Sequence, residues 1–261
     1  MPKLITSLSL IIFFSFHFLG CGSTTQNPTT PNNMGTLKIS LTDAPAAFDA
    51  VNITFSEVSA HLDNDWVTVR GDDITVNLLD FSNGRSVVIG SADVPAGMYT
   101  QIRIKIDTAW VVVGGFGHDL DVPSGAQTGL KLGPPFTINE GSTVELMLDF
   151  DANRSIVTTG PPTYPRTYKL KPRIRLISTA LTGSISGTAD PTHLPVAFAI
   201  AGADTITSTL ADKVSGGFML AFLPEGVYTV SARDTMNKSF EINDVQVVAG
   251  SDNYIGDVTL Q

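Results

Sequence analysis

Five basic side chains gather in one short stretch, and their spacing suits the binding of an anion. They are Arg166, Lys169, Lys171, Arg173 and Arg175. Alternate residues of a β-strand point to the same face, so the last four would form one row. Guanidinium and ammonium groups donate charge-assisted hydrogen bonds to carboxylates and phosphates. Because Pro172 favours an edge strand, the row would be accessible. It predicts a site for an anionic glycan or a lipid headgroup.

An acidic row offers a structural alternative to this ligand site. Glu145, Asp149 and Asp151 share one face of a predicted strand over residues 143–151. Opposite charges on neighbouring strands stabilise a sheet by roughly 0.2 to 1 kcal/mol per pair. The basic row, and a similar polar row of Gln101, Arg103 and Lys105, would then cover a solvated sheet face. Both interpretations stay open at this point.

No catalytic or metal-binding motif stands out elsewhere. The scattered His61, His118 and His193 lack the close spacing of a zinc site. No nucleophile elbow, phosphate loop or dinucleotide fingerprint is found in the sequence. We therefore predict no catalytic residue, no metal and no cofactor.

A short acidic segment imitates the start of a calcium loop without completing it. Asp149, Asp151 and Asn153 have the right alternation, but Arg154 stands where the loop needs glycine. Gly160 stands where the loop needs glutamate. Asp43, which precedes Ala44 and Pro45, is instead predicted to cap a turn.

Cys21 is the only cysteine, and it follows a segment typical of a secretion signal. Lys3 supplies a positive charge, residues 4–19 are mostly apolar, and Gly20 is the small residue that a cleavage site needs. The apolar run is shorter than the roughly 20 residues of a membrane-spanning helix. An unpaired thiol in an oxidising compartment would be reactive, and acylation would remove that reactivity.

The four residues Phe18, Leu19, Gly20 and Cys21 resemble the lipobox of bacterial lipoproteins. The resemblance implies a signal peptide over residues 1–20 and a diacylglycerol-modified Cys21. Phe18 and Leu19 depart from the preferred residues. An ordinary signal peptide, without acylation, is the alternative.

Residues 21–34 are expected to tether the anchor to the folded part. They carry Ser, Thr, Asn, Gln and Pro but no charge, so they cannot bury enough surface to fold. A flexible chain of this length spans about 20 Å. Gly22 after the cysteine favours the outer membrane under the sorting rule of enteric bacteria. We therefore expect a lipid-anchored protein of the bacterial cell envelope.

The composition argues for an acidic, all-β chain. The formal net charge is −9, and nucleic acid phosphates would repel such a protein. Short alternating segments separated by turn residues predict a β-sandwich followed by a smaller one. The first domain is expected over 35–180 and the second over 181–261. Predicted strands in the first are 36–41, 51–62, 66–69, 74–78, 99–113, 143–150 and 168–177.

One local pattern occurs in both halves. Pro-x-Gly-x-Tyr-Thr stands at residues 95–100 and again at 224–229. Proline suits the first corner of a β-turn, and a tyrosine after the turn can bury its ring while its hydroxyl bonds to backbone upstream. The pattern predicts a tyrosine corner in each domain.

The second domain resembles the carboxypeptidase regulatory-like domain, a prealbumin-like β-sandwich. The resemblance lies in Gly183, Ile185, Gly187, Gly217, Phe218, Leu220, Leu223, Pro224, Gly226, Tyr228, Thr229 and Val230. It implies a module without catalytic activity.

The first domain resembles an uncharacterised family, domain of unknown function 4382. The resemblance lies in Gly35, Leu37 and residues 41–45, 78–80, 92–103, 123–132, 148–155 and 168–172. It implies secretion as a lipoprotein and supplies no catalytic residue.

We predict non-catalytic binding or adhesion at the cell envelope, with a glycan as one ligand class. The alternatives are an assembly accessory for an envelope protein and an uncharacterised hydrolase. A polar or aromatic cleft would favour binding, and a broad apolar patch would favour a protein partner. A buried cluster of titratable groups would favour catalysis.

Overall fold

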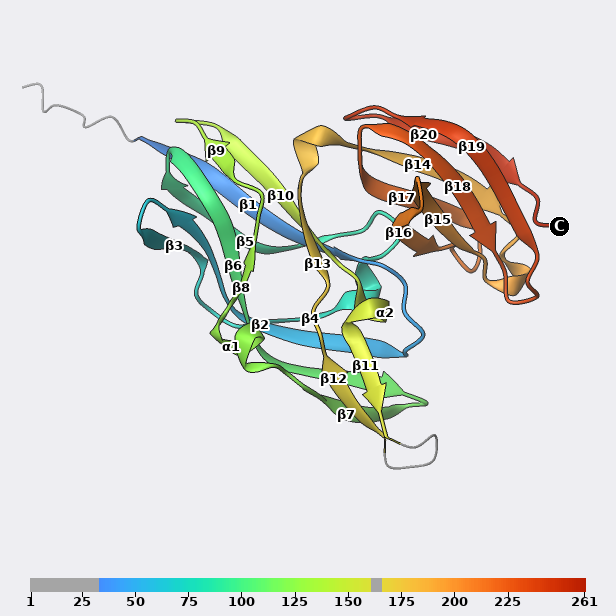
Figure 1. Ribbon diagram of the computed structural model, residues 1–261, viewed down its shortest axis with the longest axis horizontal. Coiled ribbons are helices and arrows are strands. Elements are labelled where there is room, and N and C mark those ends of the chain that lie inside the picture. Colours follow the sequence, from blue (N-terminus) through green and yellow to red (C-terminus); the bar gives the residue numbers. More distant parts are fainter. Residues whose placement is uncertain (1–32, 161–165) are drawn as a thin grey trace, which may run out of the picture. The chain divides into compact units, whose positions relative to one another are not determined.

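The computed structural model describes residues 33–160 and 166–261, and within them the regular structure is mostly strand (Figure 1). This confirms the predicted all-β, sandwich-like fold class. The predicted signal peptide, Cys21 and nearly all of the predicted tether lie outside the described residues. No helix in the described ranges is long and apolar enough to cross a membrane.

Two sheets form the first part of the fold. The order in the first is β13 (Ile174–Ser178), β10 (Thr143–Phe150), β1 (Met34–Asp43), β5 (Val87–Pro95). The order in the second is β11 (Ile156–Thr159), β12 (Thr167–Leu170), β7 (Phe116–Asp121), β6 (Gly97–Val113), β2 (Ala50–Leu62), β3 (Asp65–Arg70). Off this path, β4 (Ile74–Asn77) pairs with β2, and β8 (Leu130–Leu132) and β9 (Phe136–Ile138) pair with β6.

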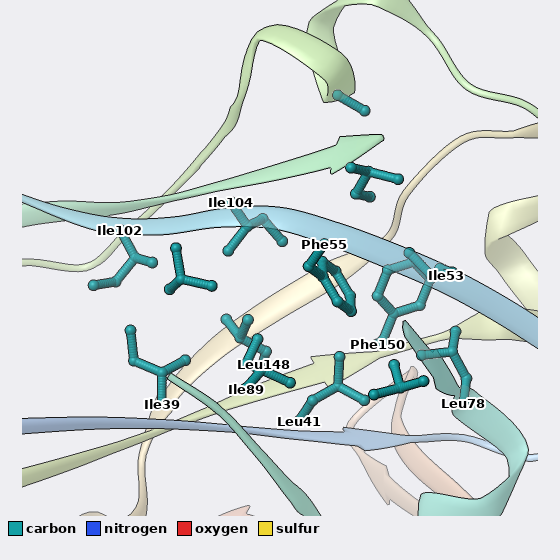
Figure 2. Close-up of a cluster of buried hydrophobic side chains, with 14 of the residues drawn as sticks. Ile39, Leu41, Ile53, Phe55, Leu78, Ile89, Ile102, Ile104, Leu148 and Phe150 are labelled. Carbon is teal, nitrogen blue, oxygen red and sulfur yellow. The ribbon is translucent and has the colours of Figure 1, made fainter. Parts of the chain in front are cut away.

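Alternating apolar residues explain why these two sheets pack together. The inward positions of β1, β10, β2 and β6 are apolar and buried, and they belong to one core cluster that Figure 2 shows. The residues of these four strands that Figure 2 labels are Ile39, Leu41, Leu148, Phe150, Ile53, Phe55, Ile102 and Ile104. Burying such a side chain contributes roughly 1.5 to 3 kcal/mol. This core fixes which face of each strand carries the polar residues.

Two further sheets enclose a second core. The order in one is β17 (Gly217–Pro224), β14 (Thr182–Ala189), β20 (Asp252–Val258). The order in the other is β16 (Asp204–Leu210), β15 (Val196–Ala201), β18 (Gly226–Arg233), β19 (Ser239–Val247). Ile185, Leu220, Val230 and Val247 are buried between them.

The two cores share no residue, but contacts connect the two pairs of sheets. Asn33–Gln261 form one compact unit. The Asn83 side chain donates to the Gly217 carbonyl at 3.2 Å and accepts the Met219 N–H. The predicted boundary at residues 180 and 181 falls between the cores, and a division into two domains stays a prediction.

The prediction of one strand over residues 168–177 was wrong. The chain forms β12 and β13 in different sheets and crosses between them at residues 171–173. Pro172 has no N–H to donate to a ladder. The buried Ser155 holds the crossing, because its carbonyl accepts the Lys171 N–H and its hydroxyl accepts the Arg173 N–H at 2.8 Å. The basic side chains therefore do not form one row.

Both predicted tyrosine corners are confirmed. Tyr99 is buried and its hydroxyl donates to the Pro95 carbonyl at 2.7 Å. Tyr228 is buried and donates to the Pro224 carbonyl at 2.8 Å. In each case the bond ties the start of a strand to the turn before it.

Candidate functional site

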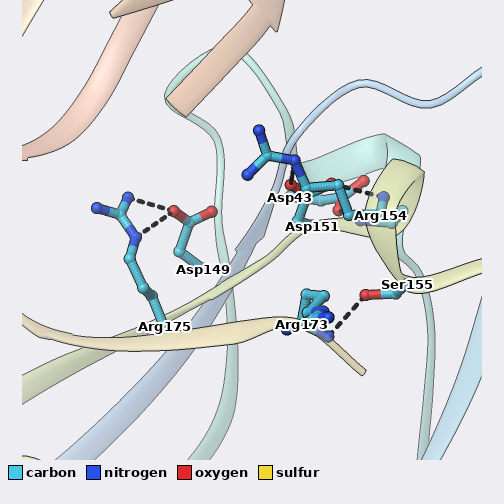
Figure 3. Close-up of polar contacts among 8 residues, drawn as sticks. Asp43, Asp149, Asp151, Arg154, Ser155, Arg173 and Arg175 are labelled. Atoms are coloured by element: carbon cyan, nitrogen blue, oxygen red, sulfur yellow. Dashed lines mark hydrogen bonds and ion pairs between the residues drawn. The ribbon is translucent and has the colours of Figure 1, made fainter. Parts of the chain in front are cut away.

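The candidate site begins where β1 and β10 end. These strands pair in parallel, so that Thr42 lies opposite Asp149 and Asp43 opposite Phe150. The short helix α2 (Ala152–Ser155) follows β10. The chain thereby brings polar residues far apart in sequence to one edge of the first sheet (Figure 3).

Asp43 and Asp151 both hold the first turn of α2. Asp43 Oδ1 accepts the buried Ala152 N–H at 2.9 Å, and Asp151 Oδ1 accepts the Arg154 N–H at 2.9 Å. Unpaired N–H groups at a helix start need such acceptors. Asp43 was predicted to cap its own turn, but its side chain caps a helix that lies 109 positions further along the chain.

Two ion pairs flank this helix start. Arg175 on β13 lies opposite Asp149 on β10, and two of its guanidinium nitrogens, Nε and Nη2, donate to Asp149 Oδ2. Arg154 Nε lies 3.4 Å from Asp151 Oδ2. The predicted pairing of acidic and basic rows is thus confirmed for Asp149 and Arg175. Lys38 and Glu145 form a further cross-strand pair at 3.0 Å.

Burial perturbs two of these carboxyl groups. It raises the pKa of Asp43 well above its ordinary value, against the lowering effect of the Ala152 N–H. Burial also raises the pKa of Asp149, and the neighbouring charge of Arg175 opposes that rise. Both groups lose the solvation that a charged carboxylate has in water. A negative charge at this edge of the sheet is therefore costly without a partner.

A cavity of about 760 Å³ opens beside the ion pairs. It has a mixed lining of acids, arginines, hydroxyls and one aromatic ring. The lining residues are Ala44, Asp149, Asp151, Asn153, Arg154, Arg173, Ile174, Arg175, Phe198, Thr205, Ile206, Thr207 and Ser208. Such a polar hollow with an aromatic side chain suits a polar ligand.

The structure divides the five predicted anion-binding residues. Arg173 and Arg175 line the large cavity. Arg166 lines a different hollow of about 490 Å³ beside β7. Lys169 Nζ lies 3.6 Å from Asp121 Oδ2, and Lys171 is exposed in the crossing between the sheets. Of the five predicted residues, only Arg173 and Arg175 therefore line the same cavity.

Sequence reasoning missed several residues of the cavity. In the sequence, Arg154 served only as an argument against a calcium loop. Its spacing of three residues from Asp151 nevertheless suits an ion pair on one helical turn. Phe198, Thr207 and Ser208 come from β15 and β16. Their local sequence carries no signal for a site, because the fold alone brings them to the cavity.

The polar row on β6 has a different, local partner. Arg103 Nη2 and Lys105 Nζ each lie 2.6 Å from a carboxylate oxygen of Glu57 on β2. The Arg103 guanidinium also lies 4.1 Å from the centre of the Trp66 ring. Trp66 is thus engaged in a cation–π contact on the sheet.

Among the described residues, no three His, Cys, Asp or Glu side chains group as they would around a metal ion. The predictions of no metal and of no catalytic residue rest on the sequence and stay predictions.

Comparisons with solved structures find weak likenesses. The Bacillus anthracis TIE protein is 11% identical with a TM-score of 0.24, and the match covers 87% of this chain and 34% of that one. A leucine-rich repeat protein from Bacteroides thetaiotaomicron is 14% identical with a TM-score of 0.23, and the match covers 88% of this chain and 26% of that one. The minor pilin GBS52 of Streptococcus agalactiae is 9% identical with a TM-score of 0.21, covering 85% of this chain and 94% of that one.

The chain thus spans about a third and a quarter of the first two of these proteins. At such TM-scores the likeness transfers neither a fold nor a function. No curated protein matches the chain.

A family model gives a firmer result. The model described as "Domain of unknown function (DUF4382)" matches residues 34–172, which include β1, β10 and α2 of the candidate site. The match does not reach residues 181–261, whose resemblance to the carboxypeptidase regulatory-like domain stays a prediction. Since the match covers more than half of the sequence, the chain belongs to the DUF4382 family.

Proposed function

We propose that this protein binds an anionic glycan at the bacterial cell envelope, without catalysis, while a lipid on Cys21 anchors it to the membrane. The observation that carries the binding proposal is the cavity that Arg154, Arg173 and Arg175 line. The cell-envelope and lipid-anchor parts rest on the sequence before residue 33.

The charges of the cavity favour an anion. Arg175 pairs with Asp149, and Arg154 lies beside Asp151, so these four charges balance in pairs. Arg173 is exposed, and no ion pair or hydrogen bond of its guanidinium is found within residues 33–160 and 166–261. One positive charge is therefore left for a ligand. A planar guanidinium can bind a carboxylate or a phosphate through two parallel hydrogen bonds.

The remaining lining favours a sugar as the carrier of that anion. Thr205, Thr207 and Ser208 can exchange hydrogen bonds with sugar hydroxyls, and Phe198 offers an apolar surface. A ligand that carries both hydroxyls and a carboxylate or phosphate would use each group of the lining.

One observation favours the hydrolase alternative. Asp43 and Asp149 are a buried pair of titratable groups with raised pKa values, which is a common feature of catalytic sites. However, Asp43 does not line the large cavity, and Arg175 holds Asp149. Each carboxyl thus has a structural partner, so binding is the better-supported function.

Exchange of Arg173 tests the binding proposal. We expect Arg173→Ala to weaken binding of uronic acid and phosphate-bearing glycans on an array by about 10-fold or more, because a charge-assisted hydrogen bond contributes roughly 1.5 to 3 kcal/mol. Lys171→Ala is the matched control, since it removes a basic side chain two residues away that does not line the cavity.

Equal binding by the Arg173→Ala, Lys171→Ala and unaltered chains would reject the cavity as the site. Cleavage of a bound glycan, seen as new products by mass spectrometry, would favour the hydrolase instead.

A further inference from the structure

Two residues that carry a buried oxygen without a hydrogen-bond partner line one small cavity next to the large one. Among the buried side-chain atoms of the described residues, Asp43 Oδ2 and Thr209 Oγ1 lack a hydrogen-bond partner. Asp43 is only 5% exposed and Thr209 only 2%. Both residues line a cavity of about 10 Å³, together with Asp149 and Thr42. A space of this size holds one group about as large as a water molecule.

Several other polar atoms of the lining residues already have partners. Asp43 Oδ1 accepts the Ala152 N–H, and Arg175 binds Asp149 Oδ2. The Thr42 hydroxyl lies 2.9 Å from the Phe81 carbonyl and 3.0 Å from that of Arg85. Asp43 Oδ2 and Thr209 Oγ1, which are buried without a partner, and the second oxygen of Asp149 are the side-chain oxygens best suited to bind a further group.

The charges around the cavity do not balance. Asp43 and Asp149 bring two carboxylates, and Arg175 neutralises one of them. Arg154 lies beside the nearby Asp151. One buried negative charge is therefore left without compensation, which is costly in a protein interior.

Three groups could occupy the cavity: a water molecule, a proton on Asp43 or a small cation. They differ in whether they provide a hydrogen-bond partner, balance the charge, or do both. A water molecule would satisfy the Asp43 and Thr209 oxygens but leave the charge. A proton on Asp43 would remove the charge but leave the Thr209 hydroxyl without a partner. A small cation would do both, and a set made only of oxygens suits hard cations rather than transition metals.

We propose that this cavity binds one hard, oxygen-preferring cation, with Asp43, Asp149 and Thr209 as ligands. Charge balance is reached by a monovalent ion such as Na⁺, whereas Ca²⁺ would leave one positive charge. The two carboxylates and the hydroxyl would supply three of the oxygen ligands of the ion. The cation site shares Asp149 with the lining of the large cavity, but it does not use the Arg173 guanidinium on which the glycan proposal rests.

Thermal unfolding under changed cations tests the proposal on the full chain. The protein is dialysed into tetramethylammonium chloride, whose cation is too large for the cavity, and NaCl, KCl or CaCl₂ is then titrated in at constant ionic strength. We expect the Tm to rise in a saturable way with at least one of the three salts, because an ion that binds only the folded state stabilises it. Equilibrium dialysis with the radiolabelled ion should give one ion per chain.

Two variants separate the ligands from the rest of the fold. Asp43→Asn keeps an oxygen for the Ala152 N–H but removes the charge. We expect it to unfold at or above the Tm of the unaltered chain in tetramethylammonium and to lose the response to the cation. Thr209→Val removes only the hydroxyl, and we expect affinity for the ion to fall about 10-fold or more. Asp121→Asn, on β7 outside the cavity, is the control and should keep the full response.

A Tm that is the same in all four salts at constant ionic strength would overturn the proposal. A proton would then balance the charge, and the stability of the unaltered chain relative to Asp43→Asn would rise as the pH falls. A cation response that Asp43→Asn and Thr209→Val both retain would equally reject this site.

Discussion

Glu57 shows at the residue scale how one carboxylate organises a sheet face. Partial burial raises the pKa of Glu57, but hydrogen bonds from Lys105, Ser59 and Arg103 outweigh this and lower the pKa from 4.5 to about 2. Arg103 in turn lies over the Trp66 ring. The polar row on β6 is thus a local network with a partner for each charge.

This network predicts a pH dependence of stability. The pKa of Glu57 is lower in the folded chain than in the unfolded one, so the unfolded chain binds more protons between pH 4.5 and 2. The stabilisation is complete above pH 4.5 and is lost as the pH falls towards 2. We expect Glu57→Gln to cost about 1 kcal/mol at neutral pH and to flatten the fall in the free energy of unfolding over this window, measured by urea unfolding.

Glu140→Gln is the control, because Glu140 lies in an exposed turn. Parallel pH curves for Glu57→Gln and the unaltered chain would contradict the role given to Glu57.

At the scale of elements, the ends of strands decide where polar groups meet. The parallel pairing of β1 with β10 places Asp43 beside α2, and the crossing at residues 171–173 moves β13 into the first sheet. In the second pair of sheets, a close approach of two backbone segments, at Gly216 and Ala189, positions neighbouring strands. Gly216 leads into β17 with a φ of 72°, and its carbonyl accepts the Ala189 N–H at 2.9 Å.

A side chain at Gly216 should therefore disrupt the pairing of β14 with β17. A Cβ atom there would lie 1.8 Å from the Ala189 carbonyl oxygen, which is backbone and cannot move aside cheaply. We expect Gly216→Ala to destabilise the protein by about 3 kcal/mol or more, with faster hydrogen exchange in β14 and β17.

Gly202→Ala is the matched control, since Gly202 has a φ of 61° but nothing lies within 4 Å of the added atom. It should cost only about 1 to 2 kcal/mol, the strain of the left-handed conformation. Equal losses for the two variants would mean that the close approach at Gly216 does not matter.

At the scale of the whole molecule, the proposed anchor and the proposed binding cavity belong to different parts of the chain. The cavity needs the folded chain, because its lining comes from β10, α2, β13, β15 and β16. The anchor needs only Cys21 and the apolar segment before it. A single acyl chain binds a membrane weakly, near 10⁴ M⁻¹, so the several chains of a lipoprotein would be required for firm attachment.

Exchange of the cysteine tests the proposed attachment. We expect Cys21→Ser, expressed in a bacterium with lipoprotein processing, to move the protein from the membrane fraction to the soluble fraction after signal removal. Ser23→Ala is the control and should stay with the membrane. Membrane partition of the processed Cys21→Ser chain would refute the lipid anchor.

The sequence by itself determined the fold class, most strands and the local turns. Alternation of apolar residues specifies which residues face a core, and Tyr99 and Tyr228 bond to backbone only four residues away. The sequence also carries the pattern that the DUF4382 family model matches over residues 34–172. These features depend on neighbours along the chain, so they can be read without the fold.

Only the tertiary structure decided which charges meet. Asp43 caps a helix more than a hundred residues away, and Arg175 pairs with Asp149 on the neighbouring strand. Thr209, which belongs to another sheet, lines the same small cavity as Asp43. The five basic residues looked like one row because the sequence does not show that the chain leaves its sheet at Pro172. Strand alternation gives the face of a residue, whereas the register and order of the sheets give its neighbours.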